Sequence, residues 1–189
     1  MKEAAHLTTA ELESGLAEIR QSPKDEGILE LIVRRPRTGE REILQMAELD
    51  ATEGLIGDSW KTRGSSSTPD KSPNRDMQLT LMNSRVIALL AREKSRWPLA
   101  GDQLFIDLDL SIDALPPGTQ LALGSAVIEI TAAPHTGCKK FTARFGMEAV
   151  QFVNSPMGKR LRLRGLNARI VRSGVISVGD RIKRISTGY

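Results

Sequence analysis

The residue in this sequence best suited to do chemistry is its single cysteine, Cys138. It lies in residues 133–140, after a β-branched apolar run, and Pro134 and Gly137 indicate that this segment is a loop. Two lysines follow the thiol, and nearby cations stabilise a thiolate and lower the pKa of a cysteine. Cys138 is therefore a candidate nucleophile, sulfur acceptor or soft metal ligand, although a lone cysteine is otherwise most often a small buried hydrophobe.

The two histidines, His6 and His135, do not predict a metal site. His135 precedes Cys138 by three residues, but these two side chains alone are too few to hold zinc. The sequence also lacks a glycine-rich Walker-type loop, a dinucleotide-binding fingerprint and a Gly-x-Ser-x-Gly nucleophile elbow. We therefore do not expect the nucleotide-dependent or serine-hydrolase chemistries that rely on those motifs.

The positive charge of the chain is concentrated near its C-terminal end. The net charge is +4, but residues 159–189 hold nine Lys and Arg against one acid, whereas residues 1–158 carry a net charge of −4. Such a basic segment could meet nucleic acid or a phosphate-bearing small molecule. Aromatic residues, which would stack on bases, make up only 4% of the chain, so nucleic acid is the less favoured partner.

Three arginines precede a change of phase in the apolar pattern of residues 161–170. Aliphatic residues occupy odd positions before Gly165 and even positions after it, which predicts a strand with a bulge or bend at this glycine. Before the bend, Arg160, Arg162 and Arg164 would line one face of the strand. That face is either a solvated edge or an anion-binding stripe.

Short alternating runs of apolar residues predict a mainly β domain. Strands are expected at residues 28–34, 43–49, 77–81, 104–110, 120–123, 126–131, 166–172 and 181–185. Helices are expected from a capping box at Thr8 to just before Pro23, and at residues 83–92 with Asn83 as N-cap. Because strands greatly outnumber helices and do not alternate with them, we expect a closed or nearly closed β-barrel with a few peripheral helices. Its interior is expected to include Leu104, Ile106, Leu108, Ile128 and Ile130.

Residues 1–26 are expected to form a helical appendage and linker, and residues 27–189 the barrel domain. The Ser-, Thr- and Pro-rich stretch between Trp60 and Arg75 has no periodicity, so we expect a mobile surface loop that adds no strand. No apolar run approaches the roughly 20 residues that span a bilayer, and the N-terminal residues hold no signal-like segment. A lone cysteine cannot form an intramolecular disulfide. We therefore expect a cytoplasmic protein without a membrane partner.

The ordered set of segments resembles the MOSC domain, a family named for the C-terminal domain of molybdenum cofactor sulfurase. The resemblance covers residues 27–185. It is carried by residues 27–36, 53–58, 74–81, 115–124, 164–170 and 174–180, together with the strand that leads to Cys138. Each segment alone is a weak motif, but all of them in the family's order make the resemblance considerably more specific.

The resemblance implies a barrel similar to the β-barrel of pyruvate kinase. It also implies that the domain binds the molybdenum cofactor, a molybdopterin, or carries sulfur on a reactive cysteine, whose position Cys138 matches. The phosphate and dithiolene of that cofactor would require cations and backbone donors. On this resemblance, Cys138 is the candidate catalytic residue and molybdenum ligand. The candidate cofactor-binding residues are Arg75, Lys139, Arg162, Arg164 and Arg169.

Three functions are consistent with the sequence. The first is a sulfur carrier or transferase that receives sulfur from a cysteine desulfurase-like partner, to which any pyridoxal phosphate would belong. The second is a molybdenum-dependent reductase of N-hydroxylated compounds, which needs an electron-transfer protein. The third is a non-enzymatic binding module for an anionic partner. The first two require Cys138 in a pocket close to arginines, whereas the third requires only an exposed basic surface. The sequence does not fix the substrate or the oligomeric state.

Overall fold

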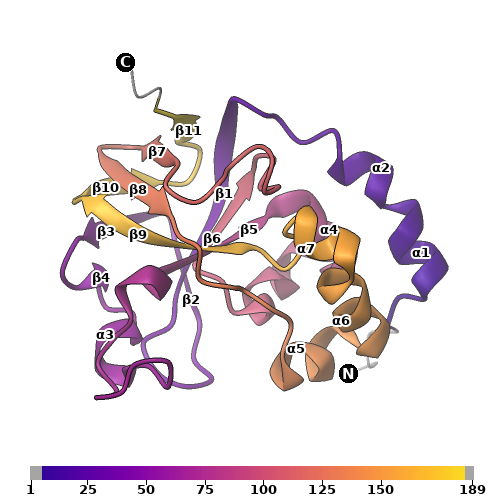
Figure 1. Cartoon of the computed structure of the whole chain (residues 1–189), viewed down its shortest axis with the longest axis horizontal. Helices are drawn as coiled ribbons and strands as arrows, with labels where there is room; N and C mark the ends of the chain where they lie inside the picture. The colour runs from indigo at the N-terminus through magenta and orange to yellow at the C-terminus, as the bar shows by residue number, and fades with distance from the viewer. Residues whose placement is uncertain (1–5, 186–189) are drawn as a thin grey trace.

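A closed β-barrel forms one half of the molecule, and most of the helices lie in the other half (Figure 1). The computed structural model describes residues 6–185. Within that range seven strands pair in a ring, because β11 pairs with both β7 and β1. In order around the ring they are β1 (Glu26–Arg34), β6 (Leu104–Asp107), β5 (Leu79–Asn83), β9 (Leu166–Arg172), β8 (Ala126–Ile130), β7 (Gln120–Leu123) and β11 (Arg181–Arg184). The predicted mainly β barrel is therefore confirmed.

Neighbouring strands of the ring are antiparallel except β5 and β6, which are parallel. The short strand β2 (Glu42–Leu44) pairs with the end of β1. A separate small sheet consists of β10 (Gly174–Ser177), β3 (Met46–Asp50) and β4 (Gly54–Leu55). The apolar run at residues 43–49 was expected to form one strand beside β1. It is instead divided between β2 and β3, which belong to different sheets.

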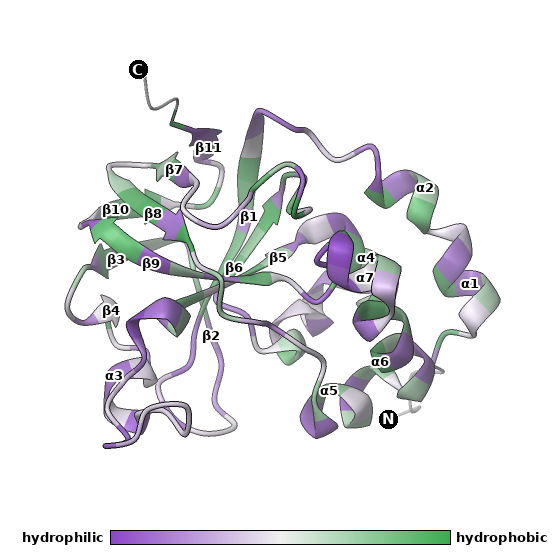
Figure 2. Ribbon diagram, viewed as in Figure 1, coloured by the Kyte–Doolittle hydropathy of each residue, from purple (hydrophilic) through white to green (hydrophobic). Residues whose placement is uncertain are grey.

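Apolar side chains fill the barrel. They lie at every second position of the strands, because successive side chains of a β-strand point to opposite faces. The five predicted interior residues are each at most 1% exposed and belong to one core cluster; they are Leu104, Ile106, Leu108, Ile128 and Ile130. Hydropathy colouring shows the hydrophobic segments concentrated on the barrel strands (Figure 2). The opposite face of the strands is also used, because Phe105 of β6 belongs to a second core cluster beneath the helices.

That second core is covered by helices from three parts of the chain. The predicted N-terminal helix is present in two pieces, α1 (Thr9–Ser14) and α2 (Leu16–Ile19), and both the capping box at Thr8 and the burial of Leu12 are observed. The second predicted helix, α4 (Ser84–Ala91), has Asn83 as its N-cap. The remaining cover comes from the 3₁₀ helix η2 (Lys94–Ala100) and from α5 (Lys139–Phe145), α6 (Met147–Asn154) and α7 (Pro156–Arg160).

The prediction of a strand across residues 161–170 with a bend at Gly165 is wrong. The segment leaves α7, turns, and becomes strand only at Leu166. Gly165 has φ +102, and a Cβ there would lie 2.2 Å from Leu81 O, so glycine is required where the turn passes the barrel wall. The change of apolar phase therefore marks the junction between helix and strand. As a consequence, Arg160, Arg162 and Arg164 do not form one stripe.

The stretch between Trp60 and Arg75 adds no strand to either sheet, as predicted, but it begins with the short helix α3 (Trp60–Arg63). The Trp60 side chain is buried and donates its indole N–H to Asn74 O at 3.1 Å. The 3₁₀ helix η1 (Arg75–Met77) follows and leads into β5. Across residues 6–185, no helix is both long and apolar enough to cross a bilayer.

Candidate functional site

Cys138 lies at the end of the segment that connects β8 to α5, and its side chain is exposed. It is the residue before α5, with extended backbone angles of φ −121 and ψ 177. The preceding Gly137 is held by the amide side chain of Asn154, which accepts from Gly137 N at 2.9 Å and donates to Gly137 O at 3.2 Å. The loop that presents the thiol is thus fixed to helix α6.

The surroundings of Cys138 favour its thiolate. Partial burial raises the pKa of the thiol, but the backbone N–H groups of Phe141 and Lys140 and the charges of Arg164 and Lys140 outweigh burial, so its pKa lies below the ordinary value. The Cys138 side chain itself forms no capping hydrogen bond with the first turn of α5. A thiolate is both the nucleophilic and the metal-binding form of cysteine.

A wholly buried carboxylate, Asp102, connects His135 with Arg164. Its Oδ1 lies 2.7 Å from His135 Nε2, and its Oδ2 accepts from Arg164 Nη1 at 2.7 Å. Burial alone would raise the pKa of Asp102, but Arg164 and His135 together hold it below the usual value. Arg164 also donates to Ala100 O at 3.0 Å and lies 4.8 Å from the centre of the Phe141 ring. Arg164 is therefore rigidly placed beside the first turn of α5.

His135 is neutral in this arrangement. Burial lowers its pKa first, the charge of Arg164 lowers it further, and Asp102 offsets these effects only in part. A neutral imidazole that contacts a carboxylate through Nε2 carries its proton on that nitrogen. His135 therefore acts as a hydrogen-bond donor to Asp102.

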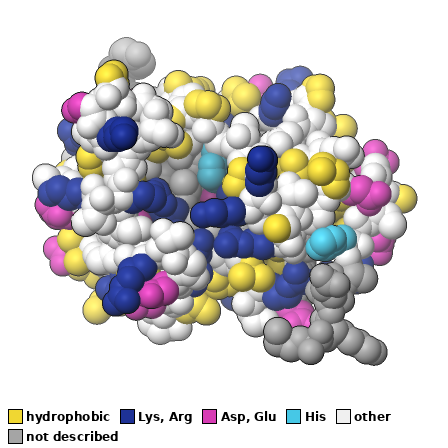
Figure 3. All heavy atoms as spheres, turned by 90° about the horizontal axis from the view of Figure 1, so that it is seen from below, with side chains coloured by type: hydrophobic (Ala, Val, Ile, Leu, Met, Phe, Trp, Pro, Cys, Tyr) yellow, Lys and Arg dark blue, Asp and Glu magenta, His cyan; other side chains and the backbone are white. Residues whose placement is uncertain are grey.

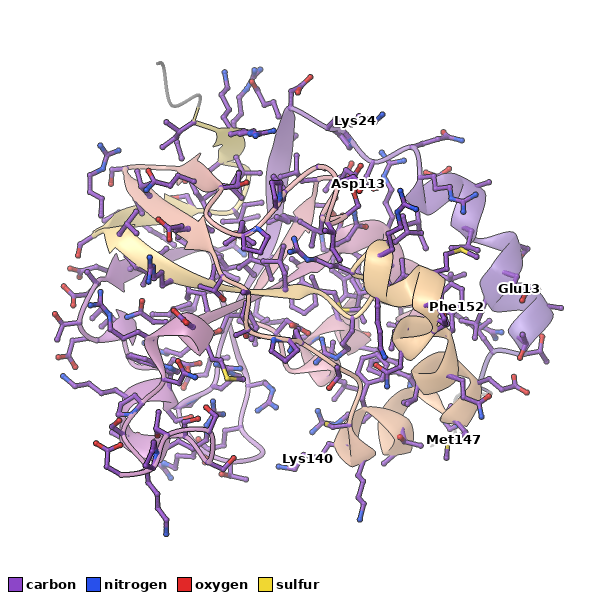
Figure 4. The ribbon with its side chains drawn as sticks, viewed as in Figure 1. Glu13, Lys24, Asp113, Lys140, Met147 and Phe152 are labelled. Atoms are coloured by element: carbon purple, nitrogen blue, oxygen red, sulfur yellow. The ribbon has the colours of Figure 1, made fainter. Side chains whose placement is uncertain are left out.

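Cys138 opens onto a cavity of about 240 Å³ that is strongly cationic. Its walls come from the loop after β1, from α3, from Gly101 and from α5. Among the described residues, seven basic side chains line it and no acidic one does; the basic ones are Arg35, Arg37, Arg41, Arg63, Lys140, Arg144 and Arg164. Lys and Arg side chains gather around the hollowed middle of this face (Figure 3). Figure 4 labels Lys140 on α5 at the same lower end of the molecule.

Two further cavities adjoin this one. A cavity of about 190 Å³ shares Arg35 and Arg63 with it, and is also lined by Trp60, His135 and Asn167. A cavity of about 470 Å³ shares Arg164 with the first and His135 with the second. Hollows with cationic and apolar walls thus lie on both sides of the loop that carries Cys138.

Asn167 is wholly buried beside the smaller cavity. Its Nδ2 donates to Ala133 O and Pro134 O, both at 3.1 Å, which fixes the loop before Cys138 to strand β9. Its Oδ1 has no hydrogen-bond partner within the described part of the chain.

The sequence-predicted binding residues fall in different places. Arg164 lines both the Cys138 cavity and the 470 Å³ cavity. Of these two, Arg162 lines only the 470 Å³ cavity, and it donates to Leu110 O and Leu115 O. Lys139 is exposed on α5 and lines none of these three cavities.

The other two predicted residues lie outside these three cavities. Arg169 is paired with Glu129 at 2.6 Å and lies 3.6 Å from Asp76. Arg75 lies next to Asp76 in the chain, with Nη2 3.5 Å from Ala51 O. The structure therefore does not bring Arg75 and Arg169 to Cys138.

Sequence reasoning missed most of the cationic wall. Arg35 is buried and held by Asp58 through two contacts, Nε–Oδ2 at 2.9 Å and Nη2–Oδ1 at 3.0 Å. Two sequence signals existed for this pair, the run of arginines after the first strand and the Gly57-Asp58 turn. Arg63 and Arg144 carried no signal, because they are distant in sequence and meet only through the fold.

Comparisons with known proteins agree with this architecture. The family model of the MOSC domain matches residues 74–183. The structure of YuaD from Bacillus subtilis superposes with a TM-score of 0.62 at 15% identity, covering 86% of this chain and 97% of that one. YiiM from Escherichia coli gives a TM-score of 0.54 at 18% identity, covering 85% of this chain and 71% of that one. The comparison with curated protein sequences gave no significant match.

Proposed function

Because this chain belongs to the MOSC domain family, we propose that it binds a molybdenum cofactor in the Cys138 cavity and uses the Cys138 thiolate there. The family is generally associated with that cofactor. The observation that carries the proposal is that Cys138 and the anchored Arg164 line one cationic cavity. The likeness to YuaD and YiiM supports the fold alone.

The residues of the cavity fit the chemistry of such a group. A molybdopterin bears a phosphate and a dithiolene, both anionic. Of the described residues that line the cavity, seven are basic and none is acidic. The Cys138 thiolate is a soft donor of the kind that a molybdenum centre takes. The cationic side chains would hold the anionic groups and Cys138 would hold the metal. When bound, the cofactor supplies a redox-active metal, while the chain supplies binding and orientation.

The exposure and lowered pKa of Cys138 favour a sulfur-carrying step. In that step the Cys138 thiolate attacks the terminal sulfur of a persulfide on a donor protein. The donor's S–S bond breaks, its own cysteine leaves as a thiolate, and Cys138 becomes the persulfide. No outside oxidant is needed, and any pyridoxal phosphate stays on the donor, a cysteine desulfurase-like protein.

The reductase alternative uses the same cysteine as a permanent metal ligand and requires electrons from a partner protein. The two functions differ in whether Cys138 carries extra sulfur. Mass spectrometry of the intact protein after incubation with a persulfide donor distinguishes them, because one added sulfur on Cys138 supports the carrier. A chain that gains no sulfur but holds molybdenum supports the reductase.

Cofactor content is the test of the proposal. The protein, Cys138→Ser and the control Met46→Ser are purified from a host that makes the cofactor, and molybdenum and oxidised pterin are measured per chain. Met46 is a sulfur-containing side chain that is 64% exposed on β3, outside the cavity. We expect molybdenum and pterin in the wild type and in Met46→Ser, and a loss of molybdenum in Cys138→Ser. If the wild type held neither molybdenum nor pterin above background, the proposal would be excluded.

A further inference from the structure

Two arginine side chains approach the same open point above Gly101, inside the cavity that Cys138 lines. A Cβ atom built on Gly101 would lie 3.7 Å from Arg41 Nη2 and 4.0 Å from Arg144 Nη1. Gly101 has φ +91, a conformation that favours glycine, so the point above it is kept clear of a side chain. Arg63 lines the same cavity from α3.

These three guanidinium groups have no carboxylate partner among residues 6–185. Arg41 donates from Nε to Pro98 O at 3.3 Å and from Nη1 to Glu40 O at 2.6 Å, and its Nη2 has no hydrogen-bond partner among the described residues. Arg144 donates from Nη1 to Leu99 O at 2.5 Å. Backbone carbonyls thus hold Arg41 and Arg144 in position without neutralising their charge.

Acids that pair with other arginines of the cavity are already engaged, and one of them is Glu40, which lies 3.5 Å from Arg37. Asp58 is buried against Arg35, and Asp102 is buried between Arg164 and His135. Neither carboxylate lines the cavity. Arg41, Arg63 and Arg144 therefore have no compensating carboxylate among the described residues that line the cavity.

The electrostatics of the arginines show the same imbalance. Burial lowers the pKa of Arg41 first, and the charges of Arg144, Arg35 and Arg63 lower it further, against a smaller opposing effect of Asp58. Burial and Arg35 likewise lower the pKa of Arg63. Cations that depress one another's pKa would be stabilised by an anion placed among them.

We propose that Arg41, Arg63 and Arg144 form a binding site for a tetrahedral dianionic oxyanion, a phosphate group, in the cavity that Gly101 lines. Guanidinium groups present paired N–H donors that match the geometry of phosphate oxygens. Three cations that line one cavity suit a dianion better than a singly charged carboxylate. The occupant is either the phosphomonoester of the cofactor, which rests on the proposed function, or a free oxyanion, which does not.

Titration calorimetry with inorganic phosphate tests the site on full-length protein made in a host that cannot synthesise the cofactor. The variants are Arg63→Gln and Arg144→Gln, with Arg172→Gln as the control. Arg172 is an exposed arginine that donates a hydrogen bond to a backbone carbonyl, Ser125 O. Arg144 likewise donates to a backbone carbonyl, Leu99 O. Within residues 6–185 the Arg63 side chain forms no hydrogen bond or ion pair, so Arg63→Gln removes no such contact from the fold.

We expect saturable phosphate binding by the wild type and by Arg172→Gln. The dissociation constant should rise about tenfold or more in Arg63→Gln and Arg144→Gln, as for loss of a charge-assisted hydrogen bond. No saturable binding by the wild type, or equal affinity in wild type and Arg63→Gln, would overturn the inference.

The same titration on cofactor-loaded protein identifies the source of the phosphate. If loading abolishes phosphate binding, the cofactor's phosphomonoester occupies the site; if binding persists, the site takes a free oxyanion, and both results support the site itself. Phosphate binding by a protein that acquires neither molybdenum nor pterin would remove the proposed function and leave this inference standing.

Discussion

Asp102 and Arg164 form a buried ion pair, with Oδ2 and Nη1 2.7 Å apart and side chains 0% and 7% exposed. Arg164 lines the Cys138 cavity, and Asp102 also holds His135 in the loop that leads to Cys138. One carboxylate therefore connects the start of β9 with the loop that presents the thiol.

Removing the charge of Asp102 should destabilise the protein strongly. In Asp102→Asn the buried guanidinium of Arg164 loses its counter-charge, which costs roughly 3–5 kcal/mol in comparable buried pairs. Urea unfolding followed by circular dichroism measures this loss. The control is Asp113→Asn, which breaks an exposed pair with Arg160 at the opposite end of the molecule from Lys140 (Figure 4) and should cost under about 1 kcal/mol. Equal losses in the two variants would show that the buried pair has no special role.

His135 should make stability depend on pH. Its pKa is lowered in the folded protein, so the unfolded chain binds the proton more readily. The contribution of His135 to the free energy of unfolding should therefore be fully present above the unfolded histidine pKa of about 6.5. It should be lost progressively as the pH drops below that value toward the folded pKa. His135→Gln should flatten this part of the profile. A wild-type profile that is level from pH 7 to pH 5 would contradict the neutral assignment of His135.

The two lysines after Cys138 should act differently on the thiol. Lys140 lowers the pKa of Cys138 through its backbone N–H and its charge, whereas Lys139 is not among the groups that do so. Rates of alkylation by iodoacetamide against pH should therefore give a higher Cys138 pKa in Lys140→Gln and an unchanged one in Lys139→Gln. The same shift in both variants would mean that only the general positive potential matters.

The segment between α3 and η1 should exchange its amide hydrogens faster than the barrel. Residues 64–74 lie outside every strand, and several of their hydrogen bonds run between nearby Ser and Thr groups of the same loop. Hydrogen exchange followed by mass spectrometry can compare this segment with β9. Protection equal to that of β9 would refute the predicted mobility.

Local patterns in the sequence predicted those parts of the fold that depend on near neighbours. Alternation in residues 104–108 and 126–130 predicted two barrel strands, and Asn83 predicted the start of α4. The helices after Cys138 were missed, although Phe141, Phe145, Ala149 and Val153 are four residues apart and all are buried. That spacing is the helical signal which the prominent loop residues obscured.

The candidate site was predictable only where it is local. Cys138 was found because Pro, Gly and Lys surround it within a few positions. Arg164 was grouped with Arg162 by a strand period that does not exist at that point; both line the 470 Å³ cavity, but only Arg164 also lines the Cys138 cavity. Arg41, Arg63 and Arg144 come from three distant segments, and only the barrel closure and the packing of α5 bring them to one cavity.

Protection of Cys138 by the cofactor tests the central proposal most directly. Protein with and without bound cofactor is treated with iodoacetamide at one pH, and carbamidomethylation of Cys138 is followed by mass spectrometry. If Cys138 faces the cofactor, loaded protein should be alkylated at least about tenfold more slowly than cofactor-free protein, because the bound thiolate is no longer available as a nucleophile. Equal alkylation rates in loaded and cofactor-free protein would contradict the assignment of Cys138 to the cofactor site.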